Sequence, residues 1–478
     1  MNTNAPDPRR WWALLVIAAA QFMVIMDTSI IGVALPEIQQ AVGFSQSGLS
    51  WVFNAYVIAL GGLLLLGGRL SDLFGARRIF IMGFAILVAG SLLAGLAQGS
   101  NVLLAGRVIQ GVGSALIAPA ALTLLMTLFA HDGRELTKAF AVFGAAAPAG
   151  GTAGVFLGGV ITEWVDWRWV FLINIPMGLA VLAASLKLLP ASVARRGSVD
   201  VLGAVTVTGA LSLAVFGIVR APDLGWTSLD TILTLSVAIA LFAGFLLIQS
   251  LKREPLMPLR IFRVPNLAAA NLVMALLGAA WVSMWFFLNL YLQQVLGYGA
   301  FEAGAALLPM TITIMVLMVG GTSRVVAKLG FKATLVAGLL LLSAGIGLLT
   351  LVRPEGTFLA DVLPATLIAA LGMSLAYIPA MLLSISSAPA EDGGLASGIV
   401  NTTYQVGSAF GLAVMTAFAS AAGADQIANA GELTNGFHAA FTGAATVALV
   451  AAAVALVWMR EAAHAQSGTE QVQETIAA

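Results

Sequence analysis

Charged residues are scarce in this sequence. Asp, Glu, Lys and Arg together make up 9% of its 478 residues, while 60% are hydrophobic; soluble domains usually carry about 25% charged residues. This composition excludes an ordinary soluble domain and indicates a protein that crosses a membrane several times. Cysteine is absent altogether, which excludes disulfide bonds and thiol chemistry.

The sequence also lacks the motifs of ATP-driven and catalytic proteins. None of its five lysines stands in a Gly-x-x-x-x-Gly-Lys-Ser/Thr loop, and neither His-Glu-x-x-His nor Gly-x-Ser-x-Gly occurs. The three histidines, His131, His438 and His464, lie in loops, at the ends of apolar runs or in the tail. We therefore expect neither an enzyme nor a bound metal or cofactor.

Long apolar runs account for most of the chain. A membrane-spanning helix needs roughly 20 mostly apolar residues, and we place fourteen such runs. They lack the alternation of apolar and polar residues that a barrel strand shows, so we expect helices, which satisfy their own backbone groups in lipid. The runs cover residues 12–35, 50–66, 79–98, 102–128, 136–162, 168–189, 200–220, 229–249, 267–296, 302–322, 331–352, 359–387, 393–421 and 435–459.

Positive charge is distributed unevenly between the connections of these runs. With the N-terminus placed in the cytoplasm, 18 of the 22 lysines and arginines fall on the cytoplasmic side, as expected because basic residues are depleted from translocated loops. We predict that both termini are cytoplasmic and that residues 461–478 form a polar tail. The one Asn-x-Ser/Thr sequence, at Asn401, lies inside a run, and with the high alanine and glycine content this favours a bacterial cytoplasmic (inner) membrane.

The connection between the second and third runs concentrates charge. Residues 67–78 carry three arginines and one aspartate, punctuated by glycine, and a weaker copy without the aspartate follows the tenth run at residues 320–332. This repeat predicts an all-α membrane protein with two six-helix halves and a two-helix insert. We expect an N-terminal bundle over 1–190, the insert over 191–255, a C-terminal bundle over 256–460 and the tail over 461–478.

Residues 67–78 resemble the loop motif between helices 2 and 3 of the major facilitator superfamily. Other segments resemble its fourteen-helix drug:proton antiporter subfamily: residues 27–36, Arg107 with Gln110-Gly111, residues 167–176, Tyr291-Leu292-Gln293 with Ala303-Gly304 and Pro309, and Ser397-Gly398 with Asn401, Gln405 and Gly407. The resemblance covers nearly the whole chain. It implies two bundles related by an axis along the membrane normal, with substrate bound between them near the midplane.

The resemblance implies roles for two glycine-containing segments. Gly68, Asp72, Gly75, Arg77 and Arg78 would latch the cytoplasmic side shut, with Asp72 near the start of the helix that begins at Gly393; the alternative is a topological anchor. The glycines that match the antiporter motif of the fifth helix are Gly150, Gly154, Gly158 and Gly159. Three of them recur every fourth residue, which permits close helix packing. Val155 stands where this motif has proline, and Gly32 stands where the first-helix motif usually has asparagine, so the direction of transport stays open.

Asp27 is the residue most suited to proton coupling. It lies deep in the first run, where an acid is costly and usually marks an ion or substrate pathway. Arg107 in the fourth run falls at nearly the same depth, so we predict an ion pair that forms and breaks during transport. The alternatives are an Asp27 bonded to its own helix and an Arg107 that reaches toward the headgroups.

Aromatic and amide residues near the expected midplane are candidates for the walls of a substrate cavity. They are Asn54, Tyr56, Trp285, Asn289, Tyr291, Tyr377, Asn401 and Gln405, and the aromatic ones would suit a cation. We therefore predict an exporter of amphipathic, possibly cationic, small molecules that is driven by the proton gradient without a cofactor. Its partners would be substrate, protons and the lipid bilayer, with no nucleic acid, and it would act as a monomer. The alternatives are a dedicated exporter of one metabolite or antibiotic and a non-transporting receptor on the same fold.

Overall fold

The computed structural model describes residues 9–129, 133–190, 200–252, 255–257, 259–260, 266–386 and 393–459. Every regular element in these ranges is a helix, as the long apolar runs predict. The expected polar tail at 461–478 lies outside the described residues.

The helices fall into three groups along the chain. The first group comprises α1 (Arg10–Val42), η1 (Gly48–Ser50), α2 (Trp51–Phe74), α3 (Ala76–Gly95), α4 (Ser100–Phe129), α5 (Gly133–Trp164), α6 (Trp169–Leu172) and α7 (Asn174–Leu188). The middle pair is α8 (Val201–Leu224) and α9 (Leu229–Leu251). The last group comprises α10 (Leu267–Leu290), η3 (Tyr291–Val295), α11 (Ala300–Val316), η4 (Leu317–Gly321), α12 (Thr322–Leu329), α13 (Phe331–Leu348), η5 (Leu349–Leu351), η6 (Phe358–Val362), α14 (Leu363–Ser386), α15 (Gly393–Ala421) and α16 (Ala430–Trp458).

The number of spanning helices differs from the fourteen predicted. In the described residues twelve helices are long and apolar enough to cross a membrane. The predicted runs 302–322 and 393–421 are not among them, although both are helical: α11 is an apolar helix of 17 residues, which continues into the π-helix η4, and α15 has 29 residues. The count of fourteen spans is therefore not confirmed, whereas the all-helical membrane fold is.

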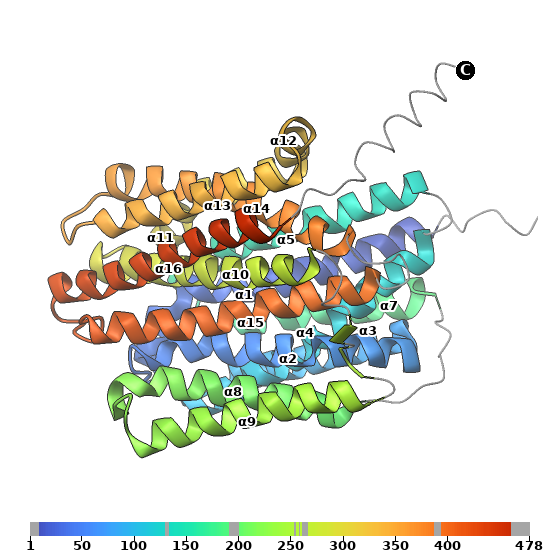
Figure 1. The fold of residues 1–478 in the computed structure, drawn as a ribbon, viewed down its shortest axis with the longest axis horizontal. Coiled ribbons are helices and arrows are strands. Elements are labelled where there is room, and N and C mark those ends of the chain that lie inside the picture. Colours follow the sequence, from blue (N-terminus) through green and yellow to red (C-terminus); the bar gives the residue numbers. More distant parts are fainter. Residues whose placement is uncertain are drawn as a thin grey trace, which may run out of the picture.

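The long helices run side by side, and two ends of the bundle can be distinguished (Figure 1). At one end, on the left of the view, lie the turns from α8 to α9 and from α15 to α16; we call it the α1–α2 end, since residues 43–50 connect those helices there. The opposite end carries the turn between α2 and α3 at Gly75 and is called the α2–α3 end. The middle pair lies along one edge, where α8 packs against α2 and α15.

Packing is densest within each group, and the two largest contacts between the first and last groups each involve one helix from either side. In the first group α1 packs along α5, and α4 packs along both α2 and α3; in the last, α10 packs along α15 and α16, and α13 along α14. Between them, α5 lies against α11 and α2 lies against α15. This is the arrangement of two six-helix bundles with an inserted pair.

Candidate functional site

Asp27 and Arg107 form a fully buried ion pair between α1 and α4. Nη1 of Arg107 lies 2.7 Å from Oδ2 of Asp27, and both side chains are 0% exposed. The prediction that these residues share a depth and meet is confirmed. Removing one charge would leave the other buried alone, which is far more costly than the buried pair itself.

Two amide side chains complete the surroundings of the Asp27 carboxylate. Gln110, three residues after Arg107, donates to Oδ1 of Asp27 at 3.0 Å, and Asn174, the first residue of α7, donates to the same oxygen at 2.6 Å. Gln110 also donates to the hydroxyl of Ser91 on α3 at 2.8 Å. The carboxylate thus accepts from three side chains, which suits the ionised acid because that form has no proton to donate.

Arg107 is held in place independently of Asp27. Its Nε donates to the backbone oxygen of Val52 at 2.9 Å, and its Nη1 donates to Oε1 of Gln110 at 2.9 Å. Its guanidinium lies 4.3 Å from the ring centroid of Tyr56, whose hydroxyl donates to Ser114 at 2.8 Å. If the aspartate were neutralised, Arg107 would still keep these contacts with α2 and α4.

The polar network around the pair has unused capacity. Nη2 of Arg107 and Oδ1 of Asn174 are buried without a hydrogen-bond partner in the described residues. Most buried polar atoms in proteins are hydrogen-bonded, so these two atoms leave room in the network for further hydrogen bonds. Each atom can take one more hydrogen bond without breaking a present one.

The role of Asn174 was not predicted from the sequence. It belongs to the segment 167–176 that resembles the family, but it lies 147 residues from Asp27 along the chain, and no spacing rule connects the two. A polar residue at the start of an apolar helix more often meets headgroups than an ion pair. Contact with the buried acid became visible only when α7 was placed against α1.

The glycines of α5 allow α1 to pack directly against the α5 backbone. A methyl group at Gly150, Gly154 or Gly158 would lie 2.4, 2.8 or 2.5 Å from the backbone oxygens of Phe22, Met26 and Ile30, respectively. The predicted close helix packing is confirmed, and the partner is the segment of α1 that carries Asp27. Gly159 faces the other way: a methyl group there would lie 2.8 Å from the backbone oxygen of Ala300 on α11.

Val155, in the position where the motif has proline, lies inside the continuous helix α5 and is buried. Its backbone oxygen faces Gly304 of α11, where a methyl group would come within 2.7 Å. Gly159 and Gly304 therefore allow the backbones of α5 and α11 to touch from both sides. A second role of this glycine motif, as a hinge between the two bundles, is a prediction that this packing leaves open.

The glycine at position 32 leaves room for a side chain from the second bundle. A methyl group at this position would lie 2.0 Å from a ring carbon of Trp285, which comes from α10 and is 8% exposed. The indole occupies the space that an asparagine side chain would need. The departure from the family motif therefore accompanies a tryptophan that reaches from the second bundle onto α1.

The charged connection between α2 and α3 differs in detail from the expectation. Gly75 has φ +89°, a backbone conformation that favours glycine, whereas Gly68 lies inside α2 with only ordinary space around it. Gly67 is the tightly packed glycine, because a methyl group there would lie 2.1 Å from the backbone oxygen of Ala115 on α4.

The expected hydrogen bonds from the arginines of this connection to Asp72 are not present. Asp72 and Arg78 are exposed, and within the described residues no ion pair joins Asp72 to Arg77 or Arg78. Arg77 instead donates to the backbone oxygen of Leu186 at the end of α7. In this structure the connection is fastened through Arg77 to its own bundle, and the latch to α15 stays a prediction.

The predicted cavity residues do not form a single wall. Tyr56 is fully buried beneath Arg107, and Tyr291 donates from its hydroxyl to the backbone oxygen of Arg353 at 2.7 Å, which places it at the α1–α2 end. Spacing along a helix does not give the direction of a tyrosine hydroxyl, and the role of these two residues in substrate binding stays a prediction.

The remaining cavity candidates lie where α2, α10, α14 and α15 meet. Asn54 and Asn289 are buried. The side-chain nitrogen and oxygen of Asn54 and Oδ1 of Asn289 have no hydrogen-bond partner in the described residues. Tyr377 and Tyr404 are half-buried with ring centroids 5.6 Å apart. The other members are Trp285, Asn401 and Gln405, of which Gln405 faces Gly61 on α2.

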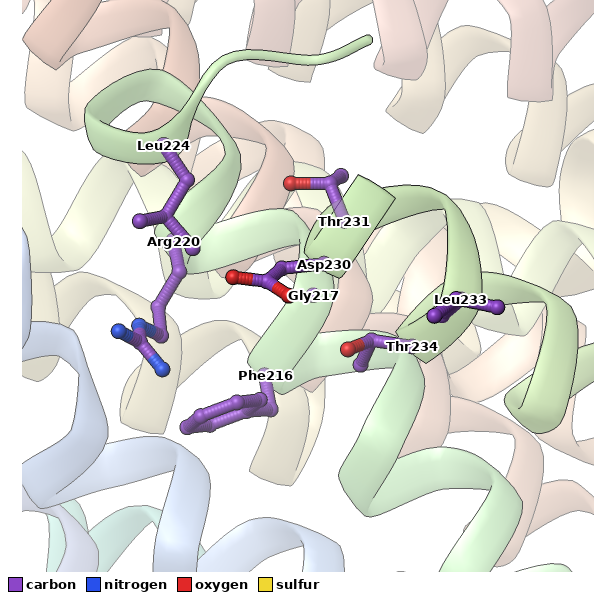
Figure 2. A pocket seen from close by; sticks show the side chains of 8 residues that line it. All are labelled: Phe216, Gly217, Arg220, Leu224, Asp230, Thr231, Leu233 and Thr234. Atoms are coloured by element: carbon purple, nitrogen blue, oxygen red, sulfur yellow. The ribbon is translucent and has the colours of Figure 1, made fainter. Parts of the chain in front are cut away.

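A separate pocket of about 230 Å³ lies between α8 and α9 near the α1–α2 end (Figure 2). Its lining combines Arg220 and Asp230 with Phe216, Gly217, Leu224, Thr231, Leu233 and Thr234. None of the predicted cavity residues lines it, and it is remote in sequence from the buried ion pair. The described residues also contain no group of three or more His, Asp or Glu side chains that could hold a metal.

A multi-pass helical bundle with a buried ion pair between its helices is the architecture of a membrane transport protein. The fold matches a solved nucleoside transporter with a TM-score of 0.65 at 12% identity, covering 94% of this chain and 99% of that one. It also matches a peptide transporter solved with sulfate, with a TM-score of 0.68 at 15% identity and 95% coverage of both chains.

Sequence comparison places the chain in one family. The model of the Major Facilitator Superfamily matches residues 17–412 and, again, residues 323–477. The chain is 36% identical to the cephamycin export protein of Amycolatopsis lactamdurans over 92% of this chain and 90% of that one. It is 35% identical to the puromycin resistance protein of Streptomyces alboniger over 99% and 94%. The chain belongs to the major facilitator superfamily, and it is a membrane transporter, not an enzyme.

Proposed function

We propose that this protein exports amphipathic small molecules, antibiotics among them, in exchange for protons. The observation that carries the proposal is the Asp27–Arg107 pair, fully buried between α1 and α4. An acid at this depth is usually functional. The export and resistance proteins of Amycolatopsis and Streptomyces support the substrate class.

During transport, a proton on the Asp27 carboxylate would take over the role that Arg107 has in this structure. A buried carboxylate that loses its cation is less costly in the protonated, neutral form. Because Arg107 stays fixed by Val52 and Tyr56, separation requires α1 to move relative to α4. Protonation would thereby be linked to the position of α1, and through the glycines of α5 to the rest of the bundle.

The setting of this mechanism follows the expectations from the sequence. The protein would lie in a bacterial cytoplasmic membrane as a monomer, with both termini and the α2–α3 end in the cytoplasm. Its two bundles would comprise residues 1–190 and 256–460, and the insert would comprise residues 191–255. The protein would belong to the fourteen-helix drug:proton antiporters. Substrate, including cationic compounds, would bind near Asn54, Trp285, Asn289, Tyr377, Asn401 and Gln405.

Substrate-driven proton flux in proteoliposomes tests the proposal. We expect Asp27→Asn to reduce flux to the leak of empty liposomes, since the variant has no carboxyl group at this depth to carry the proton. Asp230→Asn is the matched control, because Asp230 lies exposed in the first turn of α9, and it should retain wild-type flux. Normal proton flux in Asp27→Asn would exclude the mechanism.

A dedicated exporter of one antibiotic is the second candidate. It is favoured by relatives named for single compounds, cephamycin, puromycin and tetracenomycin C, whereas another is named for multidrug resistance. A panel of unrelated compounds in the same flux assay separates the two. Flux with one chemical class alone would favour the dedicated exporter.

A further inference from the structure

Three glutamines form a closed ring of hydrogen bonds at the α1–α2 end. Nε2 of Gln39 donates to Oε1 of Gln46 at 2.9 Å, Nε2 of Gln46 donates to Oε1 of Gln294 at 2.9 Å, and Nε2 of Gln294 donates to Oε1 of Gln39 at 3.1 Å. Nε2 of Gln294 also donates to Oε1 of Gln46 at 3.4 Å, so four hydrogen bonds join the three amides in what we call the amide ring. It could not be predicted from the sequence, because Gln294 lies 255 residues from Gln39.

The amide ring joins the two bundles. Gln39 belongs to the last part of α1 and Gln46 to the connection that follows, while Gln294 lies in η3 at the end of α10. This segment is a π-helix, a rare form that often occurs at functional sites. Gln294 of the second bundle is hydrogen-bonded to both Gln46 and Gln39 of the first. These contacts hold the two bundles together at this end.

An aromatic layer lies deeper along the same helices. The ring of Phe53 on α2 lies 5.5 Å from that of Trp285 and 5.8 Å from that of Phe286, both edge to face. Trp285 also fills the space beside Gly32, five residues after Asp27 on α1. The path from Asp27 toward the α1–α2 end is therefore closed twice, first by aromatic side chains and then by the amide ring.

We propose that the amide ring is the outer gate latch of the transporter, which holds the bundles together on the side opposite the charged connection. The inference rests on the proposed function and on transport by alternating access, in which the two bundles open in turn to the two sides of the membrane. An amide neither gains nor loses a proton in the physiological pH range, so the latch keeps its strength while the outside pH changes. Proton binding would then act at Asp27 and leave the latch itself unaltered.

The absence of native cysteine makes a distance measurement direct. Spin labels on cysteines at Ala41 and Ala421, exposed residues at the α1–α2 ends of α1 and α15, report the separation of the bundles in lipid nanodiscs. Gln294→Leu removes three of the four ring bonds, and we expect the ratio of outer-open to outer-closed molecules to rise about tenfold. Gln293→Leu, one residue away and outside the ring, is the matched control and should keep the wild-type distribution.

Two further variants make the result decisive. Gln294→Asn keeps the amide but is one methylene shorter, so it should act like Gln294→Leu even where leucine lowers expression. Because the two substitutions both remove the hydrogen bond from Gln294 to Gln39, Gln39→Leu combined with Gln294→Leu should open the outer side by less than the product of the two single effects. Wild-type distances in Gln39→Leu, Gln46→Leu and Gln294→Leu would overturn the latch, as would a fully multiplicative double variant. The distances need neither substrate nor proton gradient, so this result is independent of the flux test on Asp27.

Discussion

The lack of a side chain at Gly32 and the position of the Trp285 indole depend on each other. The indole lies against the α1 backbone only because position 32 has no side chain. A departure from the family motif that looks like a loss of function in the sequence is, in the structure, the counterpart of an aromatic side chain from the other bundle.

Replacing Gly32 with asparagine, the residue usual in the family motif, should therefore be harmful in this chain. The new Cβ would lie 2.0 Å from the indole, and overpacking of this kind typically costs about 1–3 kcal/mol. We expect a lower melting temperature in detergent for Gly32→Asn. The double variant with Trp285→Ala should recover part of that loss relative to Trp285→Ala alone, and equal losses in both backgrounds would contradict the steric account.

At this scale the sequence predicted the charged residues far better than the neutral ones. Asp27 and Arg107 could be found because a charge is conspicuous in an apolar run and because helix rise gives its depth. Asn174 and the glutamines of the amide ring are ordinary residues near helix ends, and the contacts of Asn174 with Asp27 and of Gln294 with Gln39 span 147 and 255 residues along the chain. Such contacts depend on how helices are placed in space, which local pattern does not specify.

Among the elements, the inserted pair is fastened at its α2–α3 end by one carboxylate. Asp200, the N-cap of α8, is 1% exposed and accepts from the backbone N–H of Gly203 at 2.9 Å, from Gln249 at 2.7 Å and from Lys252 at 2.6 Å. Gln249 in turn accepts from the backbone N–H of Met257 at 2.9 Å. The start of α8, the end of α9 and the chain beyond are thus tied together.

The same carboxylate gives this junction a pH dependence. Burial raises the pKa of Asp200, but hydrogen bonds from Lys252, Gln249 and the backbone N–H of Gly203 outweigh it and hold the pKa below its ordinary value. A lowered folded-state pKa means that the stabilisation is complete above the unfolded value of about 3.9 and is lost as the pH falls through the folded value.

Asp200→Asn should consequently lower stability at neutral pH by about 1–2 kcal/mol, because the neutral amide cannot replace the charge-assisted hydrogen bond from Lys252. The difference from wild type should stay constant down to about pH 5 and shrink as the pH falls below the unfolded-state pKa of about 3.9. Thermal unfolding in detergent over this range measures it. Asp230→Asn should show no such pH-dependent difference, and a gap between Asp200→Asn and wild type that does not shrink on acidification would refute the assignment to this carboxylate.

For the whole molecule, the two ends of the bundle use different chemistry. The α1–α2 end is closed by neutral amides and aromatic rings, whereas the charged connection at the other end leaves Asp72 exposed. The bundle architecture itself was predictable, because the apolar runs and the repeated connection indicate two halves. The count of fourteen spans is not confirmed, since neither α11, with 17 residues, nor α15 is among the twelve candidate spans of the described residues.

If Asp72 latches the cytoplasmic side in the alternate state, its removal should favour the closed outer side. With the spin labels at Ala41 and Ala421, we expect Asp72→Ala to lower the ratio of outer-open to outer-closed molecules by about three- to tenfold. Combined with Gln294→Leu, the two shifts should largely cancel. A rise in the ratio, or none, would leave the connection as a topological anchor, and Asp230→Asn again serves as the control.

The paired glycines between α5 and α11 have a consequence for the speed of transport. At Gly159 and Gly304 the two backbones meet directly, whereas helices usually pack side-chain ridges into grooves that must disengage before they can move. Beside this contact, the ring of Phe301 on α11 stacks on Trp164 of α5 with centroids 4.9 Å apart and lies 6.2 Å from Phe156. We therefore expect the turnover rate to depend on these aromatic contacts and on the ion pair, and less on the paired glycines themselves.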